Sequence, residues 1–143
     1  MYVALAGPDG TPTWSQPMAP DRRVIHMGDI TELGNLVAGA FEHEDEVGQG
    51  QHLSLAGDRM SWSDIISTLN SQGHDLAYTR APDDAWDSSF PGAREVRQMF
   101  NYFEAHTYFG PDAENKIAMA DEVTTKPFTS FASWAKSNMA PDR

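Results

Sequence analysis

The residues best suited to acid–base chemistry in this 143-residue chain are one histidine and a group of aspartates. His26 ends a short apolar run and precedes Asp29, and α/β proteins place ligands at strand ends. Asp84 and Asp87 flank Trp86, and neighbouring carboxylates can raise one pKa and form an acid–base pair. We take His26, Asp84 and Asp87 as candidate catalytic residues. The alternative interpretations are a strand histidine bonded to backbone, and polar turn residues.

Metal and thiol chemistry find no support in the residue pattern. The five histidines form no His-x-x-x-His or Glu-x-x-x-His pair, and the chain has no cysteine. We therefore predict no metal ligand and no thiol nucleophile.

The acidic charge excludes several classes of partner. The net charge is −11, from 10 Lys and Arg against 21 Asp and Glu. Such a field repels phosphate backbones and anionic lipid surfaces, so we expect neither nucleic-acid nor membrane binding. Apolar runs stay well short of the roughly 20 residues that span a bilayer. The first residues lack the basic region of a signal peptide, and we expect a cytoplasmic protein.

The elements that must position these residues follow from hydrophobic periodicity. We predict one α/β to α+β domain over residues 1–143, with a few short strands packed by about four or five helices. It comprises a strand with a proline-rich arm (1–21), a main region (22–137) and a tail (138–143). Strands are expected near 1–7, 24–27, 53–55 and 76–79. Helices are expected after Asp29, Ser61, Pro91, Asp112 and Thr129.

Four segments of the main region occur in a distinctive order. They are VIHMGDI (24–30), GQHLSLAG (50–57), FPGAREVRQMFNYF (90–103) and FTSFASW (128–134). In this order they resemble the C-terminal, substrate-side half of NmrA-like proteins, a branch of the atypical short-chain dehydrogenases. The resemblance covers most of residues 20–137. It implies a fold in which a Rossmann domain precedes this region, and relatives that act as dehydrogenases, quinone and isoflavone-type reductases or NADP(H)-binding redox sensors.

The glycine loop that such a family needs for its dinucleotide has no counterpart in the sequence. That loop follows the first strand and opens a helix, whereas Gly7 and Gly10 here stand beside a proline-rich arm. No tyrosine is followed four residues later by a lysine, the pair typical of short-chain dehydrogenases. We therefore expect a truncated protein with no cofactor-binding residues. NADP(H) would bind only if the missing half were supplied.

The resemblance also bears on ligands, because this region faces the substrate cleft in the family. We expect a flat organic ligand to contact aromatic walls. The candidate ligand-binding residues are Trp86, Phe90, Tyr102, Phe103 and Tyr108. Ordinary core packing is the alternative interpretation of these rings.

A missing Rossmann layer would leave the first predicted helix uncovered. Ile30, Leu33, Val37 and Phe41 form one apolar stripe on it. We expect a homodimer or a second type of subunit to pair through this face. The alternative is that residues 7–21 fold over it.

Three functions stay open at this point. The first is a truncated NmrA-like protein that binds a small apolar or aromatic ligand, or a partner subunit, without its own NAD(P) site. The second is a cofactor-independent acid–base enzyme (an isomerase, cyclase or hydrolase) that uses the retained cleft. The third is a fragment of an NAD(P)-dependent oxidoreductase or redox sensor.

Overall fold

The computed structural model describes residues 5–6 and 10–139, and their fold mixes α and β structure. The strands of this part are β1 (Leu5–Ala6), β2 (Pro12–Gln16), β3 (Ile25–Met27), β4 (Asp58–Met60) and β5 (Ala77–Arg80). Its helices are the short 3₁₀ helix η1 (Ile30–Glu32), α1 (Leu33–Glu42), α2 (Glu44–Val47), α3 (Trp62–Ser71), α4 (Asp83–Asp87), α5 (Ala93–His106), α6 (Ala113–Val123) and α7 (Phe131–Asn138). The predicted class, a few short strands packed by helices, is confirmed.

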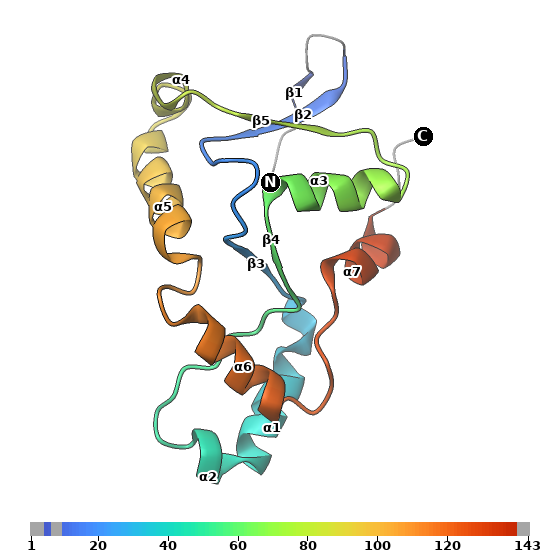
Figure 1. Cartoon of the computed structure of the whole chain (residues 1–143), viewed down its shortest axis with the longest axis vertical. Coiled ribbons are helices and arrows are strands. Elements are labelled where there is room, and N and C mark those ends of the chain that lie inside the picture. The colour runs from blue at the N-terminus through green and yellow to red at the C-terminus, as the bar shows by residue number, and fades with distance from the viewer. Residues whose placement is uncertain (1–4, 7–9, 140–143) are drawn as a thin grey trace.

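The strands form two small sheets. In the first, the order is β1-β2-β5, with β1 antiparallel and β5 parallel to β2. Parallel strands need a crossover connection, and the chain between β2 and β5 supplies it through β3, β4 and α3. In the second, β3 pairs antiparallel with β4. Figure 1 shows the first sheet at one end above α3, the second sheet in the middle, and α1, α2 and α6 at the other end.

Helix α3 is built as its sequence predicts. The Ser61 hydroxyl accepts a hydrogen bond from Asp64 N–H at 3.1 Å, and the Asp64 carboxylate accepts one from Ser61 N–H at 2.9 Å. This reciprocal capping box fixes the helix start. Trp62, Ile65 and Leu69 are buried on the inner face of the helix, at the centre of the larger hydrophobic core.

One predicted strand is wrong, and another strand lies in the proline-rich arm. Residues 53–55 form no strand, because Leu53 and Leu55 pack instead against a second core cluster around Leu36. The alternation of apolar and polar residues at 53–55 reflects packing between helices. The strand begins later, at Asp58. Conversely, the proline-rich arm carries a strand, β2. Pro12 stands at its first residue, the strand position that tolerates a missing N–H.

Two predicted helix starts also differ. Asp29 accepts from Thr31 N–H at 2.9 Å and caps η1, but Glu32 does not return the bond. The Glu32 carboxylate instead accepts from Thr129 N–H at 2.9 Å and from the Thr129 hydroxyl at 2.6 Å. The N–H and the hydroxyl of Thr129 are therefore both bonded to Glu32, and Ser130 caps α7 instead.

Candidate ligand-binding site

A cavity of about 650 Å³ opens into the larger core. Strand β2 contributes Trp14 to its wall, α3 contributes Trp62, α5 contributes Met99 and Phe100, and α7 contributes Phe131 and Trp134. Figure 1 shows α5 and α7 on opposite sides of the β3–β4 ribbon. The wall is therefore mostly aromatic and methionine side chains, as in pockets for small organic molecules.

One histidine interrupts this apolar wall. His26 lies in β3, opposite Arg59 of β4, and lines the cavity. Its ring stacks on Phe109, with centroids 4.9 Å apart and planes inclined by 27°. Both ring nitrogens are buried, and neither has a hydrogen-bond partner within the described part of the chain. The alternative interpretation, a histidine bonded to backbone, is therefore wrong.

The surroundings of His26 also control its charge. Burial lowers the pKa of His26, the positive charge of Arg59 lowers it further, and Glu114 acts in the opposite sense. Since the ordinary value is 6.5, the lowered pKa leaves the imidazole neutral at pH 7. A neutral imidazole offers one N–H donor and one nitrogen acceptor.

The loop after α5 holds aromatic rings beside this histidine. Thr107 has φ of 66°, a left-handed conformation that is rare for a β-branched residue. The loop is held there because Tyr108 N–H donates to Val24 O at 3.3 Å and Lys116 Nζ donates to Phe109 O at 3.2 Å. Tyr108 lines the cavity from the same loop. Backbone strain of this kind recurs at binding sites.

Two of the five predicted ligand-binding residues line the cavity, namely Phe103 and Tyr108. Trp86 and Phe90 pack edge to face outside it, with centroids 5.7 Å apart, and Trp86 Nε1 donates to Ala93 O at 2.9 Å. Tyr102 is exposed and contacts His106, with ring centroids 4.9 Å apart. These three rings therefore lie outside the cavity.

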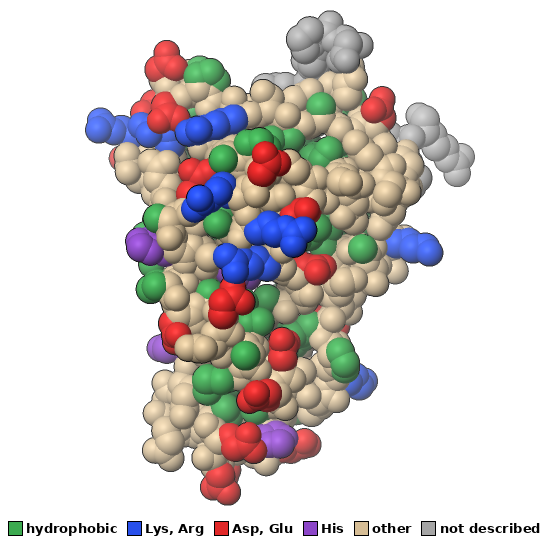
Figure 2. Space-filling model, in the orientation of Figure 1, with side chains coloured by type: hydrophobic (Ala, Val, Ile, Leu, Met, Phe, Trp, Pro, Cys, Tyr) green, Lys and Arg blue, Asp and Glu red, His purple; other side chains and the backbone are tan. Residues whose placement is uncertain are grey.

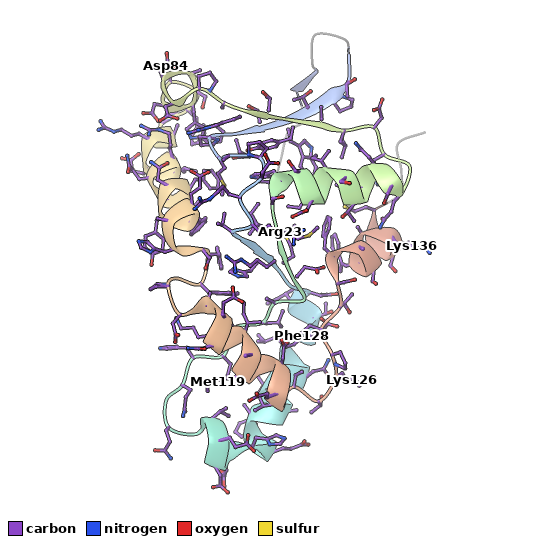
Figure 3. All side chains as sticks on the ribbon, in the orientation of Figure 1. Arg23, Asp84, Met119, Lys126, Phe128 and Lys136 are labelled. Carbon is purple, nitrogen blue, oxygen red and sulfur yellow. The ribbon has the colours of Figure 1, made fainter. Side chains whose placement is uncertain are left out.

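The aspartate pair has a structural explanation. Arg97 donates to both carboxylate oxygens of Asp87, at 2.7 and 2.6 Å, and to Asp83 at 3.0 Å. This contact lowers the pKa of Asp87, so the predicted raised pKa is wrong for that residue. Asp84 is exposed on α4, at one end of the molecule (Figure 3). Neither Asp84 nor Asp87 lines the cavity.

Sequence reasoning missed most of the wall. Trp14 lies in the proline-rich arm, and Trp62 is the first residue of helix α3. Phe100 and Trp134 lie in the segments 90–103 and 128–134, which no local pattern connects. Their apolar spacing indicated burial, but only the packing of distant elements shows that they share one space.

The arginines over β3 and β4 are paired with carboxylates. Arg23 Nε lies 2.8 Å from the Asp64 carboxylate, and Arg59 forms an ion pair with Glu114. Figure 2 shows Lys and Arg side chains (blue) interspersed with Asp and Glu side chains (red) across one face of the molecule. Among the described residues, no three His, Asp or Glu side chains come together as metal ligands.

The stripe on the first helix is exposed. Ile30 and Phe41 are 75% and 78% exposed, and Leu33 and Val37 are 45% and 46% exposed. Strand β2 of the proline-rich arm lies at the opposite end of the molecule (Figure 1), so the alternative that the arm covers this stripe is wrong for its described part. The described helices include none with the length and apolar character needed to cross a membrane.

Helix α1 instead packs through a different face. Leu36 and Gly39 are buried, and Gly39 lets the helix approach the end of α6. A Cβ atom at Gly39 would lie 1.7 Å from Val123 O. This close approach turns the stripe of Ile30 to Phe41 toward solvent.

Comparison with known proteins agrees with this architecture. The profile of the NmrA-like family matches residues 2–135. This chain belongs to the NmrA-like family. The crystal structure of a doubly substituted NmrA mutant resembles it with a TM-score of 0.57 and 16% sequence identity, over 93% of this chain. The chain spans 45% of that protein's length, and the likeness shows the shared fold. No curated protein matches the sequence.

Proposed function

We propose that this NmrA-like chain binds a small, flat, largely apolar molecule in the cavity, without a dinucleotide site of its own. The observation that carries the proposal is a space of about 650 Å³ walled by aromatic and methionine side chains. A hollow of this size is much larger than the few small voids that a close-packed interior leaves. Its volume is typical of small-molecule pockets.

The rigidity of the wall supports this proposal. Trp62 stacks on Tyr78 with centroids 5.3 Å apart and planes inclined by 10°, and Trp14 meets Trp62 edge to face at 6.0 Å. The Tyr78 hydroxyl donates to Met18 O at 2.9 Å, which anchors the stack from behind. A wall held in this way needs little reordering when a ligand enters.

The glycine that precedes β2 supports the absence of a dinucleotide loop. Gly10 has φ of 88° and stands before a strand that runs antiparallel to β1, so it does not open a helix. A phosphate-binding glycine loop needs the N–H groups of a helix start.

Family membership and the 45% span favour the third candidate, a part of an NAD(P)-dependent oxidoreductase or redox sensor.

Titration of the purified chain tests the proposal. The uncharged fluorescent probe N-phenyl-1-naphthylamine should saturate one site, whereas NADPH should show no saturation up to millimolar concentration. Replacing Phe103 by Ala should weaken probe binding roughly 2- to 12-fold, because aromatic contacts are worth about 0.5–1.5 kcal/mol. The matched control, Phe41→Ala, removes an exposed ring outside the cavity and should leave binding unchanged.

Three outcomes would count against this function. Absence of saturable probe binding refutes the cavity proposal, and so does an equal loss in Phe103→Ala and Phe41→Ala. Micromolar NADPH binding refutes the lack of a nucleotide site and supports the oxidoreductase or sensor.

A second candidate function, cofactor-independent acid–base catalysis, is favoured by the neutral His26 in the cavity wall. A neutral imidazole beside a bound carbonyl compound can accept an α-proton. Exchange of the methyl protons of 2-acetylnaphthalene with D₂O, followed by NMR, tests it. Exchange catalysed by the wild type and lost in His26→Leu supports catalysis, and binding without exchange refutes it for this substrate.

The exposed stripe supports binding of a second copy of the chain. Beside Phe41 lies a hollow of about 330 Å³, lined among others by Val37, Ala40 and Val47. A protruding ring next to an apolar hollow is self-complementary across a twofold axis. Light scattering should give twice the chain mass for the wild type and the single mass for Phe41→Glu. A monomeric wild type at high concentration refutes the dimer.

A further inference from the structure

The cavity meets solvent at α5 and the loop that follows this helix. Among the lining residues, Met99 and Tyr108 are the exposed ones, at 43% and 57%, and the others are buried or half-buried. Phe103 lies one helical turn after Met99, and its ring centroid lies 5.1 Å from that of Tyr108. Met99, Phe103 and Tyr108 therefore form the rim of the proposed ligand site.

Met99 differs in exposure from the other methionines of this core. Met18 also lines the cavity but is 2% exposed, and Met60, in the same hydrophobic cluster, is 9% exposed. Met27 and Met139 line the cavity and are half-buried. Oxidation of a thioether requires that the oxidant reach the sulfur. Met99 is therefore the cavity methionine that a dissolved oxidant meets first.

We propose that Met99 is a site of oxidation by peroxides and that its sulfoxide closes the cavity to apolar ligands. This inference rests on the proposed function, the binding of a flat apolar molecule. In the reaction with hydrogen peroxide, the Met99 sulfur attacks one oxygen atom and the O–O bond breaks. The sulfur is oxidised and keeps this oxygen, while the second oxygen is reduced and leaves as water after it receives the proton of the first.

The sulfoxide changes the chemistry of the rim. It replaces an apolar thioether by a strongly polar group, beside the rings of Phe100 and Phe103, which offer no hydrogen-bond donor. An apolar ligand that covers the sulfoxide oxygen removes its water and returns no hydrogen bond. Binding should therefore weaken about 3- to 10-fold, as expected for one hydrogen bond lost without replacement.

The test follows oxidation and binding in the same samples of the purified chain. Hydrogen peroxide is added, the oxidised methionines are located by mass spectrometry of peptides, and the dissociation constant of N-phenyl-1-naphthylamine is measured by fluorescence. Met99 should gain one oxygen before Met18 and Met60 do, and the dissociation constant should rise about 3- to 10-fold. Methionine sulfoxide reductases of types A and B together should restore the original value.

Three variants separate Met99 from other targets of peroxide. Met99→Leu keeps an apolar side chain of similar volume without sulfur, so it should bind the probe equally before and after treatment. Met119→Leu, the matched control, removes a half-buried methionine outside the cavity wall and should stay sensitive to peroxide. Met99→Gln places a polar group at the rim and should weaken binding without peroxide.

Each result decides a different point. A sulfoxide at Met99 with unchanged probe binding overturns the inference, and so does an equal loss of binding in treated Met99→Leu. Oxidation of Met18 before Met99 overturns the argument from exposure. Absence of probe binding to the untreated wild type overturns the proposed function, while the peptide masses still report whether Met99 reacts first. If Met99→Leu does not fold, time courses in the wild type decide: the loss of binding either follows the oxidised fraction of Met99, or departs from it and overturns the inference.

Discussion

Replacing Asp64 by Asn tests how helix α3 is anchored. One carboxylate oxygen of Asp64 accepts from Ser61 N–H and lies 2.8 Å from Arg23 Nε, and the other accepts from the Arg23 guanidinium at 3.0 Å. These contacts, Arg23 first, lower the pKa of Asp64 from an ordinary 3.8 to about 2. The folded protein therefore holds the ionised form more tightly than the unfolded chain does.

The size of the effect follows from this shift. Taken at full value, a fall in pKa from 3.8 to about 2 corresponds to at most about 2.4 kcal/mol of folding free energy. The Arg23 side chain is 67% exposed and that of Asp64 is 28% exposed, so solvent screens the ion pair. We expect about 1 kcal/mol after this screening. Because the folded pKa is the lower one, this stability is present above about pH 4 and is lost as the pH falls toward 2.

Urea unfolding at pH 7 and pH 3 measures both the size and the sign. Asp64→Asn keeps an oxygen for Ser61 N–H but carries no charge, so it should lose about 1 kcal/mol at pH 7. About half of that gap should remain at pH 3, where Asp64 is mostly protonated in the unfolded chain but still mostly ionised in the folded protein. Arg23→Gln should show a smaller gap with the same trend. A gap that is equal at the two pH values would refute the electrostatic reasoning.

Two further substitutions test the packing and the surface contacts. Gly39→Ala should cost more than about 2 kcal/mol in urea unfolding, because its methyl group would overlap the Val123 carbonyl. The methyl group of Gly34→Ala, in the same helix, meets no atom within 4 Å, so this variant should stabilise the protein by up to about 1 kcal/mol. Equal changes in stability for Gly39→Ala and Gly34→Ala would contradict the overlap at Gly39. Arg97 anchors α4 by two hydrogen bonds to Asp87, and Arg97→Lys replaces them by a single bond. Hydrogen exchange in α4 should therefore accelerate about 3- to 10-fold. An unchanged rate would exclude the anchoring role of Arg97.

Local hydrogen bonds explain which elements were predictable. The start of α3 depends on Ser61 and Asp64, which are three residues apart, and its buried face follows the helical period. Helix α6 likewise begins at Ala113, directly after Asp112, as predicted. Interactions that close within one turn can be read from the order of residues alone.

Long-range contacts explain the errors. Glu32 accepts from Thr129, 97 residues later, so Glu32 forms no reciprocal cap with Asp29, and Ser130 caps α7 in place of Thr129. The alternation of Leu53 and Leu55 predicted a strand, but their place between helices decides their conformation. A hydrophobic pattern states that a side chain is buried and not which surface covers it.

The sequence by itself determined the family, the mixed α and β character, and the candidacy of His26, Phe103 and Tyr108. The tertiary structure decided that Trp14 and Trp134 share one cavity with them and that Asp87 is held by Arg97. The physical reason is that a cavity is the volume left when elements distant in the chain pack together. Backbone hydrogen bonds and periodicity act over a few residues, so no local pattern encodes that volume.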